Sequence, residues 1–242
     1  MIFFAPRRRI TMPPEDLSVT VGGREVPVAI RRNARARRLI LRIDPDGCGV
    51  TVTVPSVVRL DDAISFVRGR TDWIADRLDS IPAPIALSDG AEVPVLGVAH
   101  RVRHDPNAHA VSQRDGEIAV GGRAEHLSRR LRDWFRREAR REIAPRVAAK
   151  AAQLGRKPGR ITIRDTRSRW GSCSVAGNLS FCWRLVMAPE AVLDYVVAHE
   201  VAHLAERGHG PAFWRTVEGL TDDVATAKAW LRREGPDLHR YG

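Results

Sequence analysis

The stretch YVVAHEVAHLAERGH, residues 195–209, carries the most specific chemical pattern in this chain. His199 and His203 are four residues apart, and Glu200 follows the first of them. If the segment is helical, the two imidazoles project from one face about one turn apart and can converge on a single metal ion. Glu200 then lies one step around the helix, where it can reach water rather than the ion. The pattern predicts a metal-dependent hydrolase with Glu200 as its general base.

The flanking residues favour a helix from about Pro189 to Arg207. Apolar residues recur there at helical intervals, namely Val192, Leu193, Val196, Val197, Val201 and Leu204. We expect Gly208 to end the helix in a left-handed conformation, so that the following turn brings a third histidine to the ion. Three protein ligands leave a fourth position open, as catalytic zinc sites do. The sequence therefore predicts one Zn²⁺ per chain with three ligands, His199, His203 and His209.

Further motifs accompany the histidines: Arg169-Trp170-Gly171-Ser172-Cys173, Gly177, Trp183-Arg184-Leu185, Pro189 and Phe213-Trp214. With these residues the chain resembles the YgjP-like family of small metallopeptidases, which is related to the SprT-like and WLM zincins. Residues 37–42 and 72–74 also look like the amino-terminal half of that family. The resemblance implies an α+β, zincin-like core, in which an extended peptide pairs with an edge strand above the metal. We expect that strand at Ile161–Asp165 or at Leu179–Trp183.

Strands dominate the first half of the predicted structure and helices the second. We expect strands at 19–21, 24–31, 39–43 and 50–54 in an antiparallel sheet, a helix at 61–78, and strands at 92–96, 99–103, 110–112 and 117–120. A long helix should follow at 125–154, which Pro145 should kink or split. Beyond it we expect a strand at 161–163, a hairpin formed by 169–174 and 179–185, and a final helix at 222–233. Pro94 should confine its strand to a sheet edge, and no internal repeat is evident.

This order of elements suggests three segments. Residues 1–16 should be a flexible amino terminus, residues 17–122 a β-rich region with one helix, and residues 123–242 the zincin-like metallohydrolase domain. The first residues, a short apolar patch followed by arginines, do not resemble a signal peptide, and a cytoplasmic location is the simplest expectation. The three cysteines, Cys48, Cys173 and Cys182, form no CxxC pair, and we expect reduced, buried thiols.

The chain is strongly basic, with 40 Lys plus Arg against 29 Asp plus Glu and a net charge of +11. Arginine is concentrated in two segments, formed by Arg31, Arg32, Arg35, Arg37, Arg38 and Arg42 and by Arg129, Arg130, Arg132, Arg136, Arg137, Arg140 and Arg141. A solvated face explains these runs most simply. The alternative is contact with nucleic acid or nucleotide phosphate, because guanidinium groups match phosphate oxygens.

Several other side chains are candidates for roles near the metal. Tyr195, Arg169 and Arg184 are candidates to stabilise the transition state or support the ligands, although a core hydroxyl and structural ion pairs are plainer roles for them. Asp194 or Glu206 should accept a hydrogen bond from a ligand imidazole. Four aromatic residues are candidates for substrate contact or for the core, namely Trp170, Trp183, Phe213 and Trp214.

A zinc-dependent metallopeptidase acting on protein or peptide is the favoured function. Zinc-dependent nucleotide hydrolysis of a UTP-pyrophosphatase type is one alternative, because the same chemistry attacks phosphoanhydrides. A nucleic-acid-associated protease or binding module is another.

Overall fold

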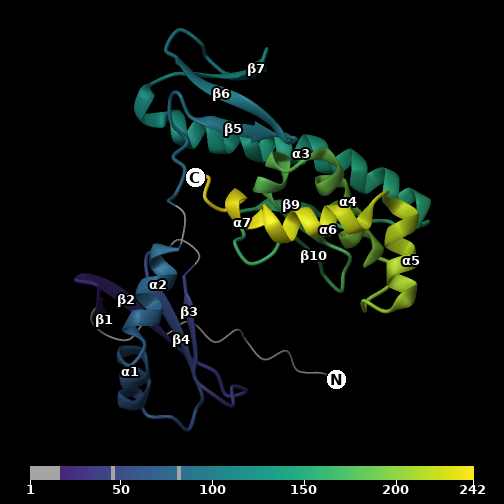
Figure 1. Cartoon of the computed structure of the whole chain (residues 1–242). Coiled ribbons are helices and arrows are strands. Elements are labelled where there is room, and N and C mark those ends of the chain that lie inside the picture. Colours follow the sequence, from purple (N-terminus) through teal and green to yellow (C-terminus); the bar gives the residue numbers. More distant parts are fainter. Residues whose placement is uncertain (1–16, 45–46, 81–82) are drawn as a thin grey trace. The chain divides into compact units, whose positions relative to one another are not determined.

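The computed structural model describes residues 17–44, 47–80 and 83–242, and the chain divides into two compact units after Ala83 (Figure 1). The expected flexible segment 1–16 lies outside the described residues. Each unit has its own hydrophobic core. The division differs from the expected boundary at 122, because the strands of residues 92–121 contribute Val93, Val102 and Ile118 to the same core as the following long helix.

Unit 1 is a four-stranded sheet followed by two helices. Its elements are β1 Ser18–Val21, β2 Arg24–Arg32, β3 Ile40–Ile43, β4 Val50–Val54, α1 Leu60–Arg68 and α2 Thr71–Asp79. The strand order is β1-β2-β4-β3, and β2 pairs with β4 in parallel. The expectation of a purely antiparallel sheet was therefore wrong. The single helix expected at 61–78 is two helices, because Gly69 caps the first and Arg70 leaves the helical region at φ −131°.

Unit 2 begins with a sheet of the same topology. Its strands are β5 Glu92–Val95, β6 Val98–Asp105, β7 Val111–Arg114 and β8 Glu117–Gly121, in the order β5-β6-β8-β7. The inner pair β6 and β8 is again parallel, as β2 and β4 are in unit 1. Pro94 lies in the edge strand β5, as predicted. The two sheets form a structural repeat that the sequence did not reveal.

A long helix supports the rest of unit 2. The short 3₁₀ helix η1 Ala124–His126 leads into α3 Leu127–Gln153. This helix is not split at Pro145. Proline removes one backbone hydrogen bond and costs about 3 kcal/mol inside a helix, but buried Ile143 and Val147 lie on either side of it. Packing of this stripe against η2 Trp183–Met187 and α4 Glu190–Ala202 offsets that cost.

A small sheet lies beside these helices and consists of β9 Ile161–Arg164, β10 Gly171–Cys173 and β11 Leu179–Cys182. The strand order is β10-β11-β9, so β10 and β9 are its edges. The expected hairpin is present as the antiparallel pair β10 and β11. Cys173 pairs in register with Leu179. Cys173 and Cys182 are free thiols, but only Cys182 is buried, so the expectation of buried thiols was wrong for Cys48 and Cys173.

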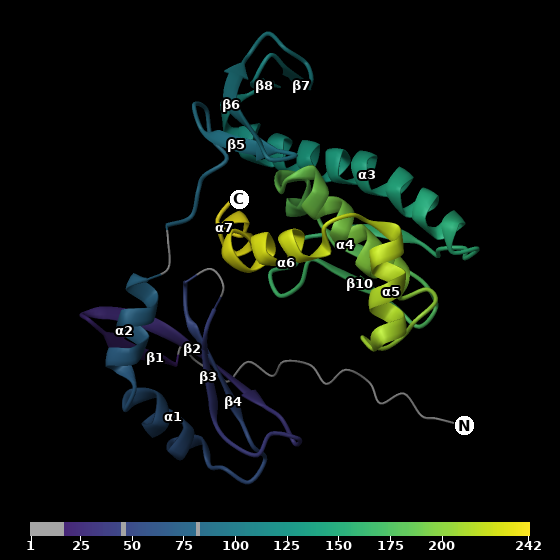
Figure 2. The same ribbon diagram turned by 45° about the vertical axis from the view of Figure 1, so that its right-hand side comes forward.

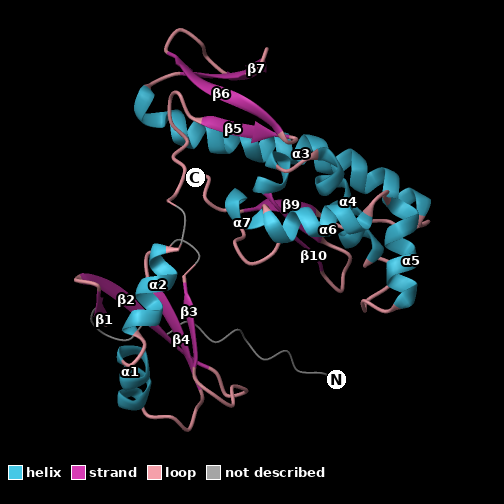
Figure 3. Cartoon of the chain, viewed as in Figure 1, coloured by secondary structure: helices cyan, strands magenta, loops and turns pink. Residues whose placement is uncertain are grey.

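The last helices surround α4. They are α5 Pro211–Leu220, α6 Val224–Arg233 and the short α7 Gly235–Leu238. Helix α4 packs against α3, α5, α6 and β10, and Figure 2 shows it between α3 and α6. Figure 3 shows the same concentration of helices in the carboxyl-terminal half. None of the helices in the described residues is long and apolar enough to cross a membrane.

Candidate metal centre

The histidine motif lies at the carboxyl end of α4. The helix ends at Ala202, five residues before the predicted end. The amides of Leu204 and Ala205 bond to carbonyls three residues back, which tightens the last turn and ends the helix. Gly208 is not left-handed, contrary to expectation. The tight turn then leads through His209 into α5, whose first residue is Pro211.

The three histidines converge as the sequence predicted. One ligand nitrogen from each of His199, His203 and His209 lies within 4.8 Å of the others. The Nε2 atoms of His199 and His209 are 3.2 Å apart. Two nitrogens bound to one tetrahedral zinc at about 2.0–2.1 Å are separated by roughly 3.3 Å. The donor set and its spacing therefore fit a zinc ion.

Hydrogen bonding and burial prepare two of the imidazoles for this role. His203 Nδ1 lies 3.0 Å from the carbonyl of Glu206, which favours a proton on Nδ1 and a free lone pair on Nε2. For His199, burial and then the positive charges of His203, His209 and Lys228 lower the pKa to about 4. His199 is therefore neutral at pH 7, as a metal ligand must be.

Phe213 forms the apolar backing of the centre. It is buried on α5, and its ring centroid lies 4.9 Å from that of His199, 4.5 Å from that of His203 and 4.6 Å from that of His209. One side chain thus limits the movement of all three imidazoles. Of the four aromatic residues considered for substrate contact, Phe213 and Trp183 belong to the core. Trp170 stacks on His239 at 4.6 Å, and Trp214 lies edge-on to His199 at 5.9 Å.

Glu200 is held against the backbone of β10. Its side chain is nearly enclosed, with 7% exposure. A Cβ atom added to Gly171 would lie 2.5 Å from Glu200 Cγ and 2.6 Å from Oε1. Residue 171 must therefore be glycine for the carboxylate to occupy this position. Sequence reasoning did not assign this role to Gly171, although the motif around it was noted.

Burial raises the pKa of Glu200 to about 7, and the positive charge of Arg169 opposes this rise. A carboxylate with a pKa near the working pH is suited to accept and return a proton. A cation beside it would favour the ionised form. The electrostatics of this position suit a general base.

A hollow of about 340 Å³ opens over the centre. Its lining consists of Gly171, Ser172 and Cys173 of β10 together with His199, Glu200, His203, Arg207 and His209. The strand beside the histidines is therefore β10, an edge strand. Neither expected strand takes this position, because β11 is central and β9 is the opposite edge. The sequence pattern could not distinguish these short strands, since their order depends on pairing.

The three further candidates occupy different surroundings. Tyr195 is buried one turn before His199, with ring centroids 6.0 Å apart, and burial followed by the charge of Glu200 raises its pKa. Arg169 is exposed, and its positive charge acts to lower the pKa of Glu200. Arg184 is fully buried, where it pairs with Asp165 and donates to the carbonyl of Tyr241 at 2.9 and 3.0 Å. Arg184 therefore has the plainer of the two roles considered for it, a structural ion pair, and it also holds Tyr241 in place.

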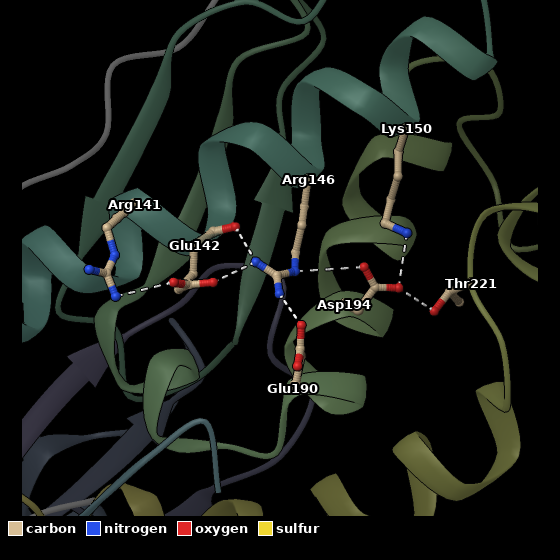
Figure 4. A network of polar contacts seen from close by, with 7 residues as sticks. All are labelled: Arg141, Glu142, Arg146, Lys150, Glu190, Asp194 and Thr221. Carbon is tan, nitrogen blue, oxygen red and sulfur yellow. Dashed lines mark hydrogen bonds and ion pairs between the residues drawn. The ribbon is translucent and has the colours of Figure 1, made fainter. Parts of the chain in front are cut away.

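Neither Asp194 nor Glu206 offers its carboxylate to a ligand histidine, contrary to expectation. Asp194 instead bonds to Lys150 at 2.9 Å and to Thr221 at 2.6 Å, in a network that joins α4 to α3 (Figure 4). Glu206 contributes its backbone carbonyl rather than its carboxylate. A backbone acceptor cannot be identified from residue type, which is why the sequence did not show it.

Most arginines of the second basic segment form ion pairs or hydrogen bonds with other residues of the protein. Arg129 and Arg136 pair with Asp133, Arg141 pairs with Glu138 and Glu142, and Arg130 and Arg140 donate to backbone carbonyls. The expectation of phosphate contact therefore has less support there. In the first segment, Arg32 donates to the carbonyls of Ser56 and Val58.

A protein family and a solved structure resemble this chain. The family model described as the YgjP-like metallopeptidase domain matches residues 37–234, which confirms the resemblance inferred from the motifs. The crystal structure of the metallopeptidase zymogen of Pyrococcus abyssi abylysin is 24% identical, over 41% of this chain and 97% of that chain, with a TM-score of 0.35. No curated protein matches the chain.

Proposed function

The chain belongs to the YgjP-like metallopeptidase family, and from that premise we propose that it is a zinc-dependent peptidase that uses Glu200 as its general base. The observation that carries the proposal is the convergence of three imidazoles beside a buried carboxylate in an open hollow. Within the described residues, the cluster that could hold a metal contains three histidines and no fourth ligand. This leaves the open position that a catalytic zinc requires.

The residues present have complementary roles in peptide hydrolysis. His199, His203 and His209 would hold the zinc ion, which would supply Lewis acidity toward water and the scissile carbonyl. Glu200 accepts a proton from the attacking water and passes it to the leaving amide nitrogen. Tyr195 and Arg169 are the remaining candidates to stabilise the developing oxyanion. Phe213 and the carbonyl of Glu206 keep the imidazoles in orientation.

Strand β10 is suited to hold the substrate. As the edge of its sheet it has one side free of strand pairing, and it forms one wall of the hollow that contains Glu200. An extended peptide that adds to this edge places its backbone beside the reacting groups. Binding through backbone hydrogen bonds favours unfolded or extended segments as substrates.

The test compares the wild-type protein with Glu200→Gln, prepared in parallel. We expect both to retain equal amounts of zinc, measured by elemental analysis, while only the wild type hydrolyses an unfolded protein. Glutamine keeps the size of the side chain but cannot accept the proton. His209→Ala serves as the ligand control and should lose zinc and activity together.

The same proteins are assayed with UTP and with DNA-bound protein. Hydrolysis of UTP alone, abolished by Glu200→Gln, would replace the peptidase assignment with nucleotide hydrolysis. Cleavage confined to DNA-bound protein would point to a nucleic-acid-associated protease. Loss of zinc from Glu200→Gln would contradict the separation of base and ligands.

A further inference from the structure

A second hollow adjoins the metal centre and is lined by basic side chains. It has a volume of about 340 Å³ and shares His203 and Arg207 with the hollow that contains Glu200. Arg156 and Lys157 complete its basic lining, and no carboxylate lies among its lining residues. Three permanent positive charges therefore border a space that continues from the proposed site of hydrolysis.

These three side chains have no acidic partner among the described residues. Among the described residues Arg156, Lys157 and Arg207 form no ion pair, and Arg207 donates to the carbonyl of Val175 at 2.7 Å. Arg156 and Lys157 follow the end of α3, where added cations often compensate free helix carbonyls. Here the amides of Leu154, Gly155 and Arg156 already bond to the carbonyls of the last turn. The charged groups remain available to a ligand.

Two hydrogen bonds hold the walls of the hollow in place, one between backbone groups and one to a side chain. The amide of Gly159 bonds to the carbonyl of Gly177 at 2.9 Å, and the amide of Arg160 bonds to Asn178 Oδ1 at 2.9 Å. These bonds join the segment after α3 to the turn that follows β10. A ligand thus meets a largely preformed site, which reduces the ordering cost of binding.

The position of the hollow next to β10 indicates which part of a bound peptide would enter it. The turn residues Ser174, Val175 and Gly177 line it, and they directly follow Cys173, the last residue of β10. A peptide paired with β10 therefore continues toward this hollow. Its side chains would meet three cations there, and the complementary groups are the carboxylates of Asp and Glu.

We propose that Arg156, Lys157 and Arg207 form a substrate subsite that selects an acidic side chain near the scissile bond. This inference rests on the proposed peptidase function. It gives specificity to a site whose strand pairing alone would accept nearly any sequence. It also explains why the cations next to the centre lack acidic partners within the protein.

The test uses matched peptides in which Glu, Gln or Lys occupies each position flanking the scissile bond. We expect the wild type to cleave the best Glu peptide roughly tenfold faster in kcat/KM than its Gln counterpart, because several partly exposed ion pairs act together. The preference should decrease with added salt. Arg156→Gln/Lys157→Gln should reduce this ratio toward one, and Arg156→Glu/Lys157→Glu should favour the Lys peptide. Arg114→Gln, which removes one positive charge on the exposed strand β7, serves as the control for a charge change away from the hollow and should keep the wild-type ratio.

A binding measurement separates this inference from the peptidase proposal. Fluorescence anisotropy with zinc-loaded Glu200→Gln should show tighter binding of the Glu peptide than of the Gln peptide, and the double substitution should remove the difference. Equal affinity for the two peptides, or a difference that survives Arg156→Glu/Lys157→Glu, would overturn the subsite even if the protein is a peptidase. If no peptide is cleaved but the charge-dependent binding is found, the peptidase proposal fails. The three cations then bind acidic peptide without a scissile bond to select, which overturns the subsite as stated. Tight binding of UTP, without a preference among the peptides, would reassign the hollow to phosphate and overturn the proposal as stated.

Discussion

At the scale of single residues, the closest constraint on the centre is the contact between Gly171 and Glu200. A methyl group at 171 would overlap the carboxylate, since its carbon would lie 2.6 Å from Oε1. We therefore expect Gly171→Ala to displace Glu200 and reduce kcat by about a hundredfold or more, the usual effect of losing a positioned base. Bound zinc should stay near the wild-type level. The check is kcat together with zinc content, and Gly159 is unsuitable as a control because its surroundings are equally tight.

Gly219 offers a better control for that substitution. It lies in α5, and an added Cβ meets nothing within 4 Å. Gly219→Ala should leave activity unchanged, and alanine should raise the free energy of unfolding slightly because it is a better helix former. If Gly171→Ala retained full activity, Glu200 would not be held by this contact.

His239 predicts a pH dependence of stability. Burial, followed by the positive charges of Arg184 and Arg167, lowers its pKa to about 4, and its ring stacks on Trp170. In the unfolded chain a histidine has a pKa of about 6.5. Between these values the unfolded state binds a proton that the folded state does not, so stability falls as the pH decreases through 6.5 toward 4.

The expected loss between pH 7 and pH 5 is about 1 kcal/mol, reduced from the full linkage value because the ring is only half buried. Urea unfolding of the wild type and His239→Gln at both pH values, with matched zinc content, measures it. Glutamine does not titrate, so the variant should show a smaller change between the two pH values. An identical change in both proteins would exclude His239 as the source.

At the scale of elements, the attachment of α4 to α3 depends on the network around Asp194. Lys150 is 8% exposed, and its ammonium group donates to Asp194 and to the carbonyl of Leu220. Arg146 forms ion pairs with three carboxylates, those of Asp194, Glu142 and Glu190 (Figure 4). Removing one partner leaves a mostly buried cation without compensation. We expect Asp194→Ala to lower the free energy of unfolding by about 2–3 kcal/mol.

Chemical denaturation measures this effect, with Glu190→Gln as the control in the same network. The side chain of Glu190 is 67% exposed, and exposed ion pairs contribute about 0–1 kcal/mol. The control should therefore change stability little. Comparable losses in the two variants would mean that burial of Lys150 does not determine the strength of the network.

At the scale of the whole molecule, the two units have separate cores. All residues of the unit 2 core lie after Ala83, and the metal centre is built entirely within that unit. We therefore expect residues 84–242 alone to fold cooperatively and to bind zinc with the stoichiometry of the full chain. Circular dichroism and metal analysis of the fragment test this, with the His209→Ala fragment as the control for specific binding. A fragment that is unfolded with zinc present would show that unit 1 is required for stability.

The sequence allowed prediction of those features that depend on local spacing. Histidines at i and i+4 share a helix face whatever the helix packs against, so His199, His203 and the adjacent Glu200 could be assigned without a fold. The alternation of apolar residues likewise predicted the positions of β1 to β8. Pro94 indicated an edge strand because proline cannot donate to a ladder.

Tertiary structure decided the features that depend on pairing between distant segments. Residue patterns do not encode strand order. Only the fold showed that β2 pairs in parallel with β4 and β6 with β8. Only the fold showed that β10, rather than β9 or β11, lies beside the centre. The structure also decided between the two candidate roles of Arg184, since its partners Asp165 and Tyr241 are remote in sequence. Local spacing indicated which groups we propose for the chemistry, and long-range packing determined what surrounds them.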